Sequence, residues 1–200
     1  MKSKEYYEKI ASKWEKEYPS SGNIDEMWDF YKECGYKDPQ DTIRNLLNGV
    51  EWNKASMLDL GCDNGFMLKT ICDWFPSVSG IGIDINSNAI KKAQTFFPEY
   101  TFETFNGIKI PYEDKSFDLV LVCAVVKHIR YEDREKFYSE ILRVADSVLF
   151  IEKDSKIEEE VNQYSWTFYH SDFEKEFEEF FEPLEITHEG GDLLGLYRCR

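Results

Sequence analysis

A glycine-containing loop between two apolar segments is the first place in this chain where residue types and spacing could bind a ligand. The segment 57-MLDLGCDNGFML-68 is typical of a strand, a tight turn and the beginning of a helix. Gly61 permits a sharp turn with close backbone approach, and Gly65 lets the helix begin against a ligand. The N–H groups in the first turn of that helix favour a carboxylate or a phosphate. The segment therefore predicts a loop that holds an anionic part of a ligand.

The spacing of the two glycines argues against a dinucleotide cofactor. The fingerprint for such a cofactor is G-x-G-x-x-G, whereas this loop runs Gly61-Cys62-Asp63-Asn64-Gly65 and has no third glycine in register. An NAD(P)-dependent oxidoreductase is therefore the weaker enzyme hypothesis. By themselves, two glycines at this spacing are more typical of an ordinary strand-to-helix turn, so other residues have to decide the function.

Polar residues that follow the later strands are further candidates for binding and catalysis. Asp84 ends the segment 80-GIGID-84, and a carboxylate at that point can accept hydrogen bonds from both hydroxyls of a ribose. Asn106 follows the next expected strand. His128, in 125-VVKHI-129, comes just after a fourth apolar strand and is the best-placed candidate for a base. A histidine that is hydrogen-bonded into the start of the next element is an equally good explanation of His128.

Strand and helix patterns alternate through the middle of the chain. Several apolar runs are nearly continuous, which is typical of strands covered on both faces in a parallel sheet. Strands are expected at 56–60, 79–84, 100–104, 118–125 and 147–153, and helices at 66–75, 88–97 (capped by Ser87) and 133–145. This alternation predicts an α/β fold in which ligands bind beyond the carboxyl ends of the strands.

The C-terminal part departs from this alternation. Ser171 and Glu174 form the signature of a capping box for a helix at 172–181, which Pro183 is expected to stop. Two short apolar segments joined by a glycine pair follow, and they predict an antiparallel hairpin over 184–200.

We expect a single domain over residues 1–200, with a helical cap at 1–50 and a candidate lid insertion at 154–170. The length suits one sizeable core, and no apolar run is long enough to predict a membrane span. The polar N-terminus lacks the apolar core of a signal peptide, so the expected location is cytoplasmic.

Cysteine spacing and net charge argue against two kinds of binding partner, metal ions and nucleic acid. The five cysteines show no spacing typical of a zinc site or a disulfide framework, so we expect no metal. The formal net charge of −15 argues against sequence-independent binding to nucleic acid, which depends on Lys and Arg to neutralise phosphates.

Three stretches together resemble motifs of the class I S-adenosylmethionine-dependent methyltransferases. The stretch 57-MLDLGCDNG-65 is similar to the first motif of that family, 81-IGIDIN-86 to the second, and 110-IPYEDKSFDLVL-121 to the segment leading through the fourth strand. The resemblance covers roughly residues 40–153 by motif and extends to the C-terminus by topology. It implies a Rossmann-like three-layer sandwich whose seven-stranded, mostly parallel sheet ends in an antiparallel hairpin.

The resemblance also implies a cofactor, S-adenosyl-L-methionine, with S-adenosyl-L-homocysteine as the product. Asp59 and the loop from Gly61 to Gly65, with Cys62 and Asp63 inside it, would hold the methionine part. Asp84 would bind the ribose, and Ile85 would pack beside the adenine. The residues implied around the adenine and the sulfonium are Asn106, Gly107, Ile108, Cys123 and Ala124.

Asp63 departs from the family pattern, which most often has glycine at this position. Aspartate tolerates left-handed backbone conformations better than most residues, so the turn is expected to survive. The carboxylate of Asp63 is unfavourable near the carboxylate of the cofactor and favourable near its ammonium. We expect cofactor binding that is weaker or differently polarised, and not lost.

The leading hypothesis is methyl transfer to a small molecule. The chain reads CAVV at 123–126 and lacks the Asn-Pro-Pro-Tyr motif of enzymes that methylate amino groups of bases or glutamine. Aromatic residues grouped at 6–18 and 164–169 suggest a partly apolar acceptor pocket. The alternatives are a catalytically weak or inactive protein that binds S-adenosylmethionine and, less favoured, the oxidoreductase.

Overall fold

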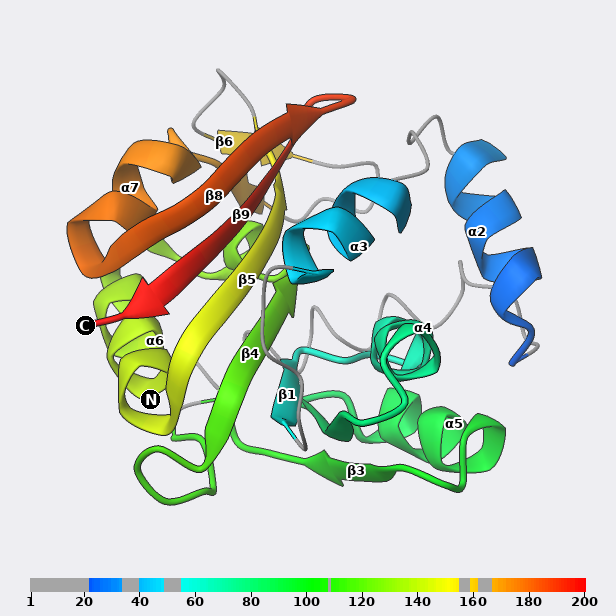
Figure 1. The fold of residues 1–200 in the computed structure, drawn as a ribbon. Helices are drawn as coiled ribbons and strands as arrows, with labels where there is room; N and C mark the ends of the chain where they lie inside the picture. The colour runs from blue at the N-terminus through cyan, green and yellow to red at the C-terminus, as the bar shows by residue number, and fades with distance from the viewer. Residues whose placement is uncertain (1–21, 34–39, 49–54, 108, 155–158, 162–166) are drawn as a thin grey trace.

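The computed structural model describes residues 22–33, 40–48, 55–107, 109–154, 159–161 and 167–200. Its centre is a seven-stranded sheet in the order β3-β2-β1-β4-β5-β9-β8 (Figure 1). The neighbours from β3 to β5 pair in parallel, and β9 pairs antiparallel with both β5 and β8. The predicted α/β sheet with a terminal hairpin is therefore confirmed. Its strands are β1 (Ser56–Leu60), β2 (Ser79–Asp84), β3 (Thr101–Thr104), β4 (Phe117–Cys123), β5 (Ala145–Lys153), β8 (Phe181–Glu189) and β9 (Asp192–Cys199).

The order of the strands reverses at β1. β2 pairs with one side of β1 and β4 with the other, both in parallel register. The carboxyl ends of β1, β2 and β4 consequently meet at one edge of the sheet. Ligands of open α/β sheets bind at such a reversal, so the fold puts the loop of residues 61–65 where the sequence predicts a cofactor loop.

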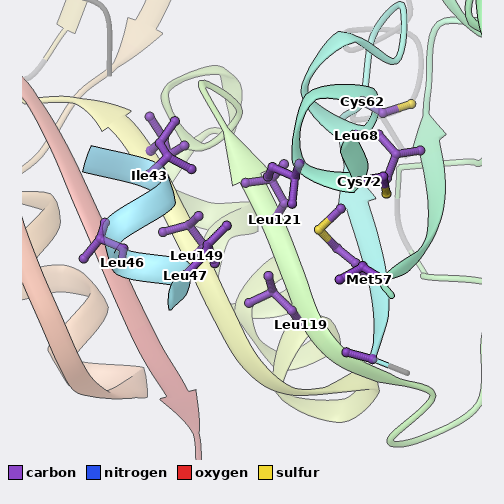
Figure 2. Packing of buried hydrophobic residues seen from close by; sticks show 14 of the residues in the cluster. Ile43, Leu46, Leu47, Met57, Cys62, Leu68, Cys72, Leu119, Leu121 and Leu149 are labelled. Atoms are coloured by element: carbon purple, nitrogen blue, oxygen red, sulfur yellow. The ribbon is translucent and has the colours of Figure 1, made fainter. Parts of the chain in front are cut away.

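Helices cover both faces of the sheet. On one face lie α3 (Gln40–Asn48), α4 (Phe66–Trp74) and α5 (Ser87–Phe96), which share a buried core with the strands. Figure 2 shows Ile43 and Leu47 of α3 beside Leu149 of β5. On the other face lie α6 (Tyr131–Val144) and α7 (Phe173–Phe180). The three layers are the predicted helix–sheet–helix sandwich.

Aromatic rings pack the face covered by α6 and α7. Phe150 of β5 stacks on Phe177 of α7 with ring centroids 3.9 Å apart. Tyr138 of α6 and Tyr197 of β9 meet the ring of Phe150 edge to face, at 6.3 and 5.9 Å. All four side chains are fully buried. Because each ring removes a large apolar area from water, this cluster holds both helices and the hairpin to the centre of the sheet.

The start of α5 differs from the sequence expectation. Oδ1 of Asn86 accepts the N–H groups of Asn88 and Ala89 at 3.0 and 3.3 Å, and Ser87 is the first helical residue. Ser87 is therefore not the cap. Asparagine caps a helix as well as serine does, and here it stands one residue closer to the end of β2.

The capping box expected at α7 is also wrong. Asp172 caps this helix by accepting the N–H of Lys175 at 3.2 Å, whereas the hydroxyl of Ser171 bonds to Glu176. The helix ends at Phe180, so Pro183 does not stop it. Pro183 lies inside β8 at an irregularity in the pairing, which proline tolerates because β8 is an edge strand.

The first helix that the structure describes, α2 (Ile24–Glu33), packs over the start of α4. Met27 and Trp28 are buried against Phe66, and the rings of Trp28 and Phe66 are 4.9 Å apart. α2 and α3 lie within residues 1–50, whose role as a helical cap stays a prediction, and the aromatic residues at 6–18 lie outside the described residues.

The insertion predicted at 154–170 contains a small antiparallel sheet of its own. It pairs β6 (Glu159–Val161) with β7 (Thr167–Tyr169). Within the described ranges, no helix is long and apolar enough to cross a membrane.

Replacing Phe150 by alanine should destabilise the fold strongly. The substitution removes a fully buried ring, and large-to-small changes of this kind lower the free energy of unfolding by about 3–5 kcal/mol. Leu184→Ala is the matched control, because Leu184 is 45% exposed in β8 and its loss should cost less than about 0.5 kcal/mol. Urea unfolding followed by circular dichroism measures both, and equal effects would contradict this account of the core.

Candidate active site

The loop after β1 is anchored to the neighbouring strand through its backbone. The N–H groups of Gly61 and Cys62 both donate to the carbonyl oxygen of Ile83, at 2.8 and 3.1 Å. Gly61 has a φ of +85°, and a Cβ added there would lie 2.5 Å from Cγ2 of Val125. Glycine therefore lets this turn pass close to the segment that follows β4.

Gly65 closes the loop in a left-handed conformation and is the N-cap of α4. Its φ is +83°, and its N–H donates to the carbonyl oxygen of Cys62 at 2.8 Å. A Cβ at this position would lie 2.6 Å from Cζ of Phe102 in β3. α4 consequently begins at Phe66, and its N-terminal end, with the positive end of the helix dipole, lies at the edge where the strands end.

Asp63 and Asp84 are joined through the backbone of the loop. Asp63 has a φ of +45°, so the turn does accommodate an aspartate in the left-handed region. In this conformation the N–H of Asp63 donates to Oδ2 of Asp84 at 3.0 Å, while the N–H of Asn86 donates to Oδ1 at 2.7 Å. Burial raises the pKa of Asp84, and these N–H groups oppose the rise. The Asp84 carboxylate is thus held by a hydrogen bond at each oxygen.

Asp59 is a buried acid in the central strand. It is 1% exposed, and its Oδ2 has no hydrogen-bond partner among the described residues. Burial raises the pKa of Asp59 to about 8, and the negative charges of Asp84 and Asp63 raise it further. Asp59 is therefore mostly protonated at neutral pH, and a cationic ligand group beside it would favour its ionised form.

The residues expected around the adenine follow β2 and β3. Ile85 comes directly after β2, and its Cδ1 lies 3.1 Å from the point where a Cβ of Gly107 would stand. Asn106 is exposed, and its Oδ1 accepts the N–H of Lys109 at 3.2 Å. Ile108 lies outside the described residues. Paired strands thus bring Ile85 and Gly107 together, and the part of these residues in binding adenine stays a prediction.

Cys123 is the last residue of β4, and the chain bends sharply after it. Ala124 has a φ of +57°, a strained conformation for alanine, and its N–H donates to the carbonyl oxygen of Ile151 at 2.7 Å. Burial raises the pKa of the Cys123 thiol, and the charge of Glu152 raises it further. The thiol is therefore neutral at physiological pH, which suits a wall of a binding site and not a nucleophile.

His128 lies in a short 3-10 helix, η1 (Val126–His128), that follows β4. Its ring meets the ring of Phe168 in β7 edge to face, with centroids 5.1 Å apart. Burial lowers the pKa of His128 well below its ordinary value, and the neighbouring Lys127 and His170 lower it further. The imidazole is therefore neutral at physiological pH. It can accept a hydrogen bond, but it is a weak proton acceptor.

Glu152 of β5 is a functional candidate that the sequence pattern alone did not single out. It is 1% exposed, and its Oε1 accepts the N–H groups of Val125 and Val126 at 2.6 Å each. Burial raises the pKa of Glu152 to about 7, while Lys127 and these N–H groups oppose the rise. The carboxylate therefore holds the beginning of η1. The available signal was an acid directly after an apolar run, in 148-VLFIE-152.

Arg134 of α6 holds the other end of η1. Its buried guanidinium donates from Nε to the carbonyl oxygen of Ile129 at 3.1 Å and from Nη2 to that of Val126 at 3.4 Å. It also donates to the carbonyl oxygen of Tyr169 in β7 and forms an ion pair with Glu176 of α7 at 2.7 Å. Arg134 thus ties η1 to the inserted sheet and to α7. No local pattern indicates this role, because the partners are spread along the chain.

Comparison with known proteins points to a family of enzymes. Residues 58–147, from β1 into β5, match the family described as "Methyltransferase domain". Over 107 residues, the chain is also 31% identical to norajmaline N-methyltransferase from Rauvolfia serpentina. The aligned segment covers 50% of this chain and 36% of the relative. These matches support a class I S-adenosylmethionine-dependent methyltransferase. S-adenosylmethionine is accordingly the cofactor against which the residues of the site are compared.

Two further proteins are similar to this chain, one in sequence and one in fold. A putative 23S rRNA (guanine-N(1)-)-methyltransferase from Bacillus subtilis is 30% identical over 95 residues, 44% of this chain and 34% of that one. The chain therefore spans about a third of the length of either curated relative. A solved structure with a similar fold is geranyl diphosphate C-methyltransferase from Streptomyces coelicolor, in complex with Mg2+, geranyl diphosphate and S-adenosyl-L-homocysteine. Its superposition on this chain has a TM-score of 0.73, with 12% sequence identity, and covers 98% of each chain. This last similarity concerns the fold alone.

The residues of this methyltransferase fit a sulfonium cofactor. The buried oxygen of Asp59 without a described partner suits a cationic group. The N-terminal end of α4, which begins after Gly65, would favour the carboxylate of the cofactor through its helix dipole. Asp84, whose carboxylate is held from both sides, would accept the ribose hydroxyls.

The raised pKa of Asp59 predicts that stability depends on pH. The pKa moves from its ordinary 3.8 to about 8 on folding, so between these values the folded protein keeps a proton that the unfolded chain has released. The free energy of unfolding should therefore fall as pH rises across this range. In Asp59→Asn the free energy of unfolding should fall less steeply with pH, by about 1 kcal/mol per pH unit. Urea unfolding of both proteins between about pH 6 and 7.5 measures the slopes. Equal slopes would contradict the raised pKa.

Removing the carboxylate of Glu152 should loosen η1. In Glu152→Ala the N–H groups of Val125 and Val126 lose their acceptor, so their hydrogen exchange should accelerate about tenfold to a hundredfold. The N–H of Leu121, inside β4, is the internal control that separates local loosening from global unfolding. Exchange measured by NMR that accelerates equally at all three sites would show that Glu152 supports the whole fold and not the turn.

Proposed function

We propose that the protein transfers the methyl group of S-adenosylmethionine to a small-molecule acceptor. The observation that carries the proposal is the Asp84 carboxylate, held by two N–H groups beside the glycine loop in a chain of the methyltransferase family. The cofactor supplies a methyl group on a positively charged sulfur, which a nucleophile attacks in line. The protein has to bind and align the two reactants, and alignment alone accounts for much of the acceleration.

The charge of the chain supports a small-molecule acceptor. Lys and Arg number 24 against 39 Asp and Glu, a balance that disfavours contact with a phosphate backbone. One relative carries a small molecule in its name, norajmaline. The segment CAVV at 123–126, which begins at the last residue of β4, also lacks the Asn-Pro-Pro-Tyr motif of enzymes that methylate bases.

Ribosomal RNA is the second candidate acceptor, because one relative is named as a putative 23S rRNA methyltransferase. Incubation with cofactor carrying a radioactive methyl group, and with either total RNA or a panel of phenols, amines and carboxylates, distinguishes the two. Label in RNA would overturn the small-molecule proposal and leave methyl transfer intact. Cofactor binding without label in any acceptor would favour a non-catalytic binding protein.

His128 would act on the acceptor from η1. Its lowered pKa keeps the imidazole neutral, so it would orient an acceptor by taking a hydrogen bond. It would remove a proton only from an acceptor that is already acidic. Phe168, whose ring lies against His128, would form an apolar wall of the same pocket.

Calorimetry with S-adenosylmethionine and S-adenosylhomocysteine tests the cofactor site. The natural sequence should bind both, and Asp84→Ala should bind each about a hundredfold more weakly, because the ribose hydroxyls and the N–H of Asp63 lose their acceptor. Asp146→Ala is the control, since this exposed acid lies at the start of β5, at the opposite edge of the sheet. Failure of the natural sequence to bind either ligand at millimolar concentration would sink the proposal.

Replacing His128 by alanine should spare cofactor binding and slow turnover about tenfold to a hundredfold. The reason is that the imidazole touches the acceptor and not the cofactor. The rate with an acceptor from the screen measures the effect. In the natural sequence, titration of His128 should not change the turnover rate near pH 6.5, because the pKa of this imidazole lies well below that value. Unchanged turnover would remove His128 from the mechanism.

A further inference from the structure

Two rings from different elements form the candidate wall of the acceptor pocket. His128 lies in η1 and Phe168 in β7, with ring centroids 5.1 Å apart. η1 is a three-residue 3-10 helix, and β7 belongs to a two-stranded sheet that is separate from the seven-stranded one. Elements of these two kinds are only marginally stable by themselves. The spacing of the two rings therefore has to be fixed by other side chains.

Arg134 of α6 donates hydrogen bonds to both of these elements. Its Nε donates to the carbonyl oxygen of Ile129 at 3.1 Å. Its Nη2 donates to the carbonyl oxygen of Val126 at 3.4 Å and also to that of Tyr169. Ile129 and Tyr169 each directly follow one of the two ring residues in the chain. Because a guanidinium is rigid and planar, it holds the three carbonyl groups in one arrangement.

The guanidinium is itself held by the packing of α6 and α7. Nη1 donates to Oε2 of Glu176 at 2.7 Å, and Oε1 of Glu176 accepts the hydroxyl of Tyr138 at 2.6 Å. The guanidinium carbon lies 4.7 Å from the ring centre of Tyr131 and 5.4 Å from that of Phe173. Arg134 is 3% exposed, so these contacts fix its orientation with little competition from water.

The two sets of contacts use different atoms of the same side chain. Nη1 faces Glu176 of α7, whereas Nε and Nη2 donate to the backbone of η1 and β7. The packing of α6 on α7 does not by itself require a guanidinium, because apolar side chains of similar volume often stabilise a core as well as a buried ion pair does. The three carbonyl acceptors do require several donors at fixed angles. Substitutions can therefore separate the two roles.

We propose that Arg134 is a positioning residue that fixes the spacing of His128 and Phe168 and so sets the shape of the acceptor pocket. The inference rests on the proposed function, because it requires that these two rings face the acceptor. Arg134 acts through the backbone that it holds and not by contact with a reactant. A displacement of about 1 Å can slow a reaction about a hundredfold, so a residue outside the pocket can control the transfer.

NMR of Arg134→Lys tests the inference. Lysine keeps the positive charge beside Glu176, but one ammonium cannot replace the planar set of donors to three carbonyl groups. Labelling histidine with carbon-13 follows His128, one of three histidines in the chain, and His128→Asn assigns its signal. The signal should move toward its position in Phe168→Leu, because the ring beside the imidazole is displaced. The pKa of His128 should also rise toward its ordinary value as its burial lessens.

The same variant should affect the acceptor and spare the cofactor. With an acceptor from the screen, kcat/KM should fall about tenfold to a hundredfold, because the two rings are misplaced. The Kd of S-adenosylhomocysteine, measured by calorimetry, should stay unchanged, since Arg134 has no contact with the loop of residues 61–65 or with Asp84 among its described partners.

Glu176→Gln is the matched control, because it removes the ion pair on the α7 side and leaves the donors to η1 and β7 in place. It should lower the free energy of unfolding and leave the His128 signal and kcat/KM unchanged. If Arg134→Lys does not fold, Arg134→Gln combined with Glu176→Gln replaces it. This double variant leaves no unpaired buried charge from the pair, and comparison with Glu176→Gln alone isolates the loss of the donors.

An unchanged His128 signal on loss of the guanidinium, or an equal movement in Glu176→Gln, would overturn the inference and leave the proposed function standing. Failure of the natural sequence to bind S-adenosylhomocysteine would overturn the proposed function and the role in acceptor binding with it. A moved His128 signal with unchanged kcat/KM would also overturn that role.

Discussion

Parallel pairing of β1 with β2 on one side and β4 on the other is the constraint on which the rest of the site depends. It brings the ends of three strands to one edge, so that Asp59, Asp84 and Cys123 converge from distant parts of the chain. Hydrogen bonds from the loop to Ile83 then join two of these strand ends. A shift of β1 by one residue would turn Asp59 to the opposite face of the sheet and break those bonds.

Buried charges around this edge serve two different purposes. Asp59 and Asp84 are buried beside the loop of residues 61–65, where a cationic ligand group would favour their ionised forms. Glu152 and Arg134 instead hold a three-residue turn at its two ends. An acid at the beginning and a base at the end match the dipole of a helical turn. Because burying charges is unfavourable, their placement at both ends of η1 indicates that the position of this turn matters.

Much of the fold was predictable from local patterns. Apolar runs and helical spacing located all the parallel strands to within two residues, since burial on both faces leaves a pattern that is visible along the chain. The exact helix starts were less predictable. Asn86 and Asp172 cap where Ser87 and Ser171 were expected, because neighbouring polar residues have similar capping tendencies and the end of the preceding segment selects among them.

The sequence by itself determined the loop between Gly61 and Gly65, the acid at the end of β2 and the family, because these depend on residue type and on short spacing. The tertiary structure decided what surrounds them. Three features arise between segments that are far apart in the chain: the raised pKa of Asp59, the lowered pKa of His128, and the hydrogen bond from Arg134 to the carbonyl oxygen of Tyr169. Burial and hydrogen bonding across such distances come from packing, which no local pattern records.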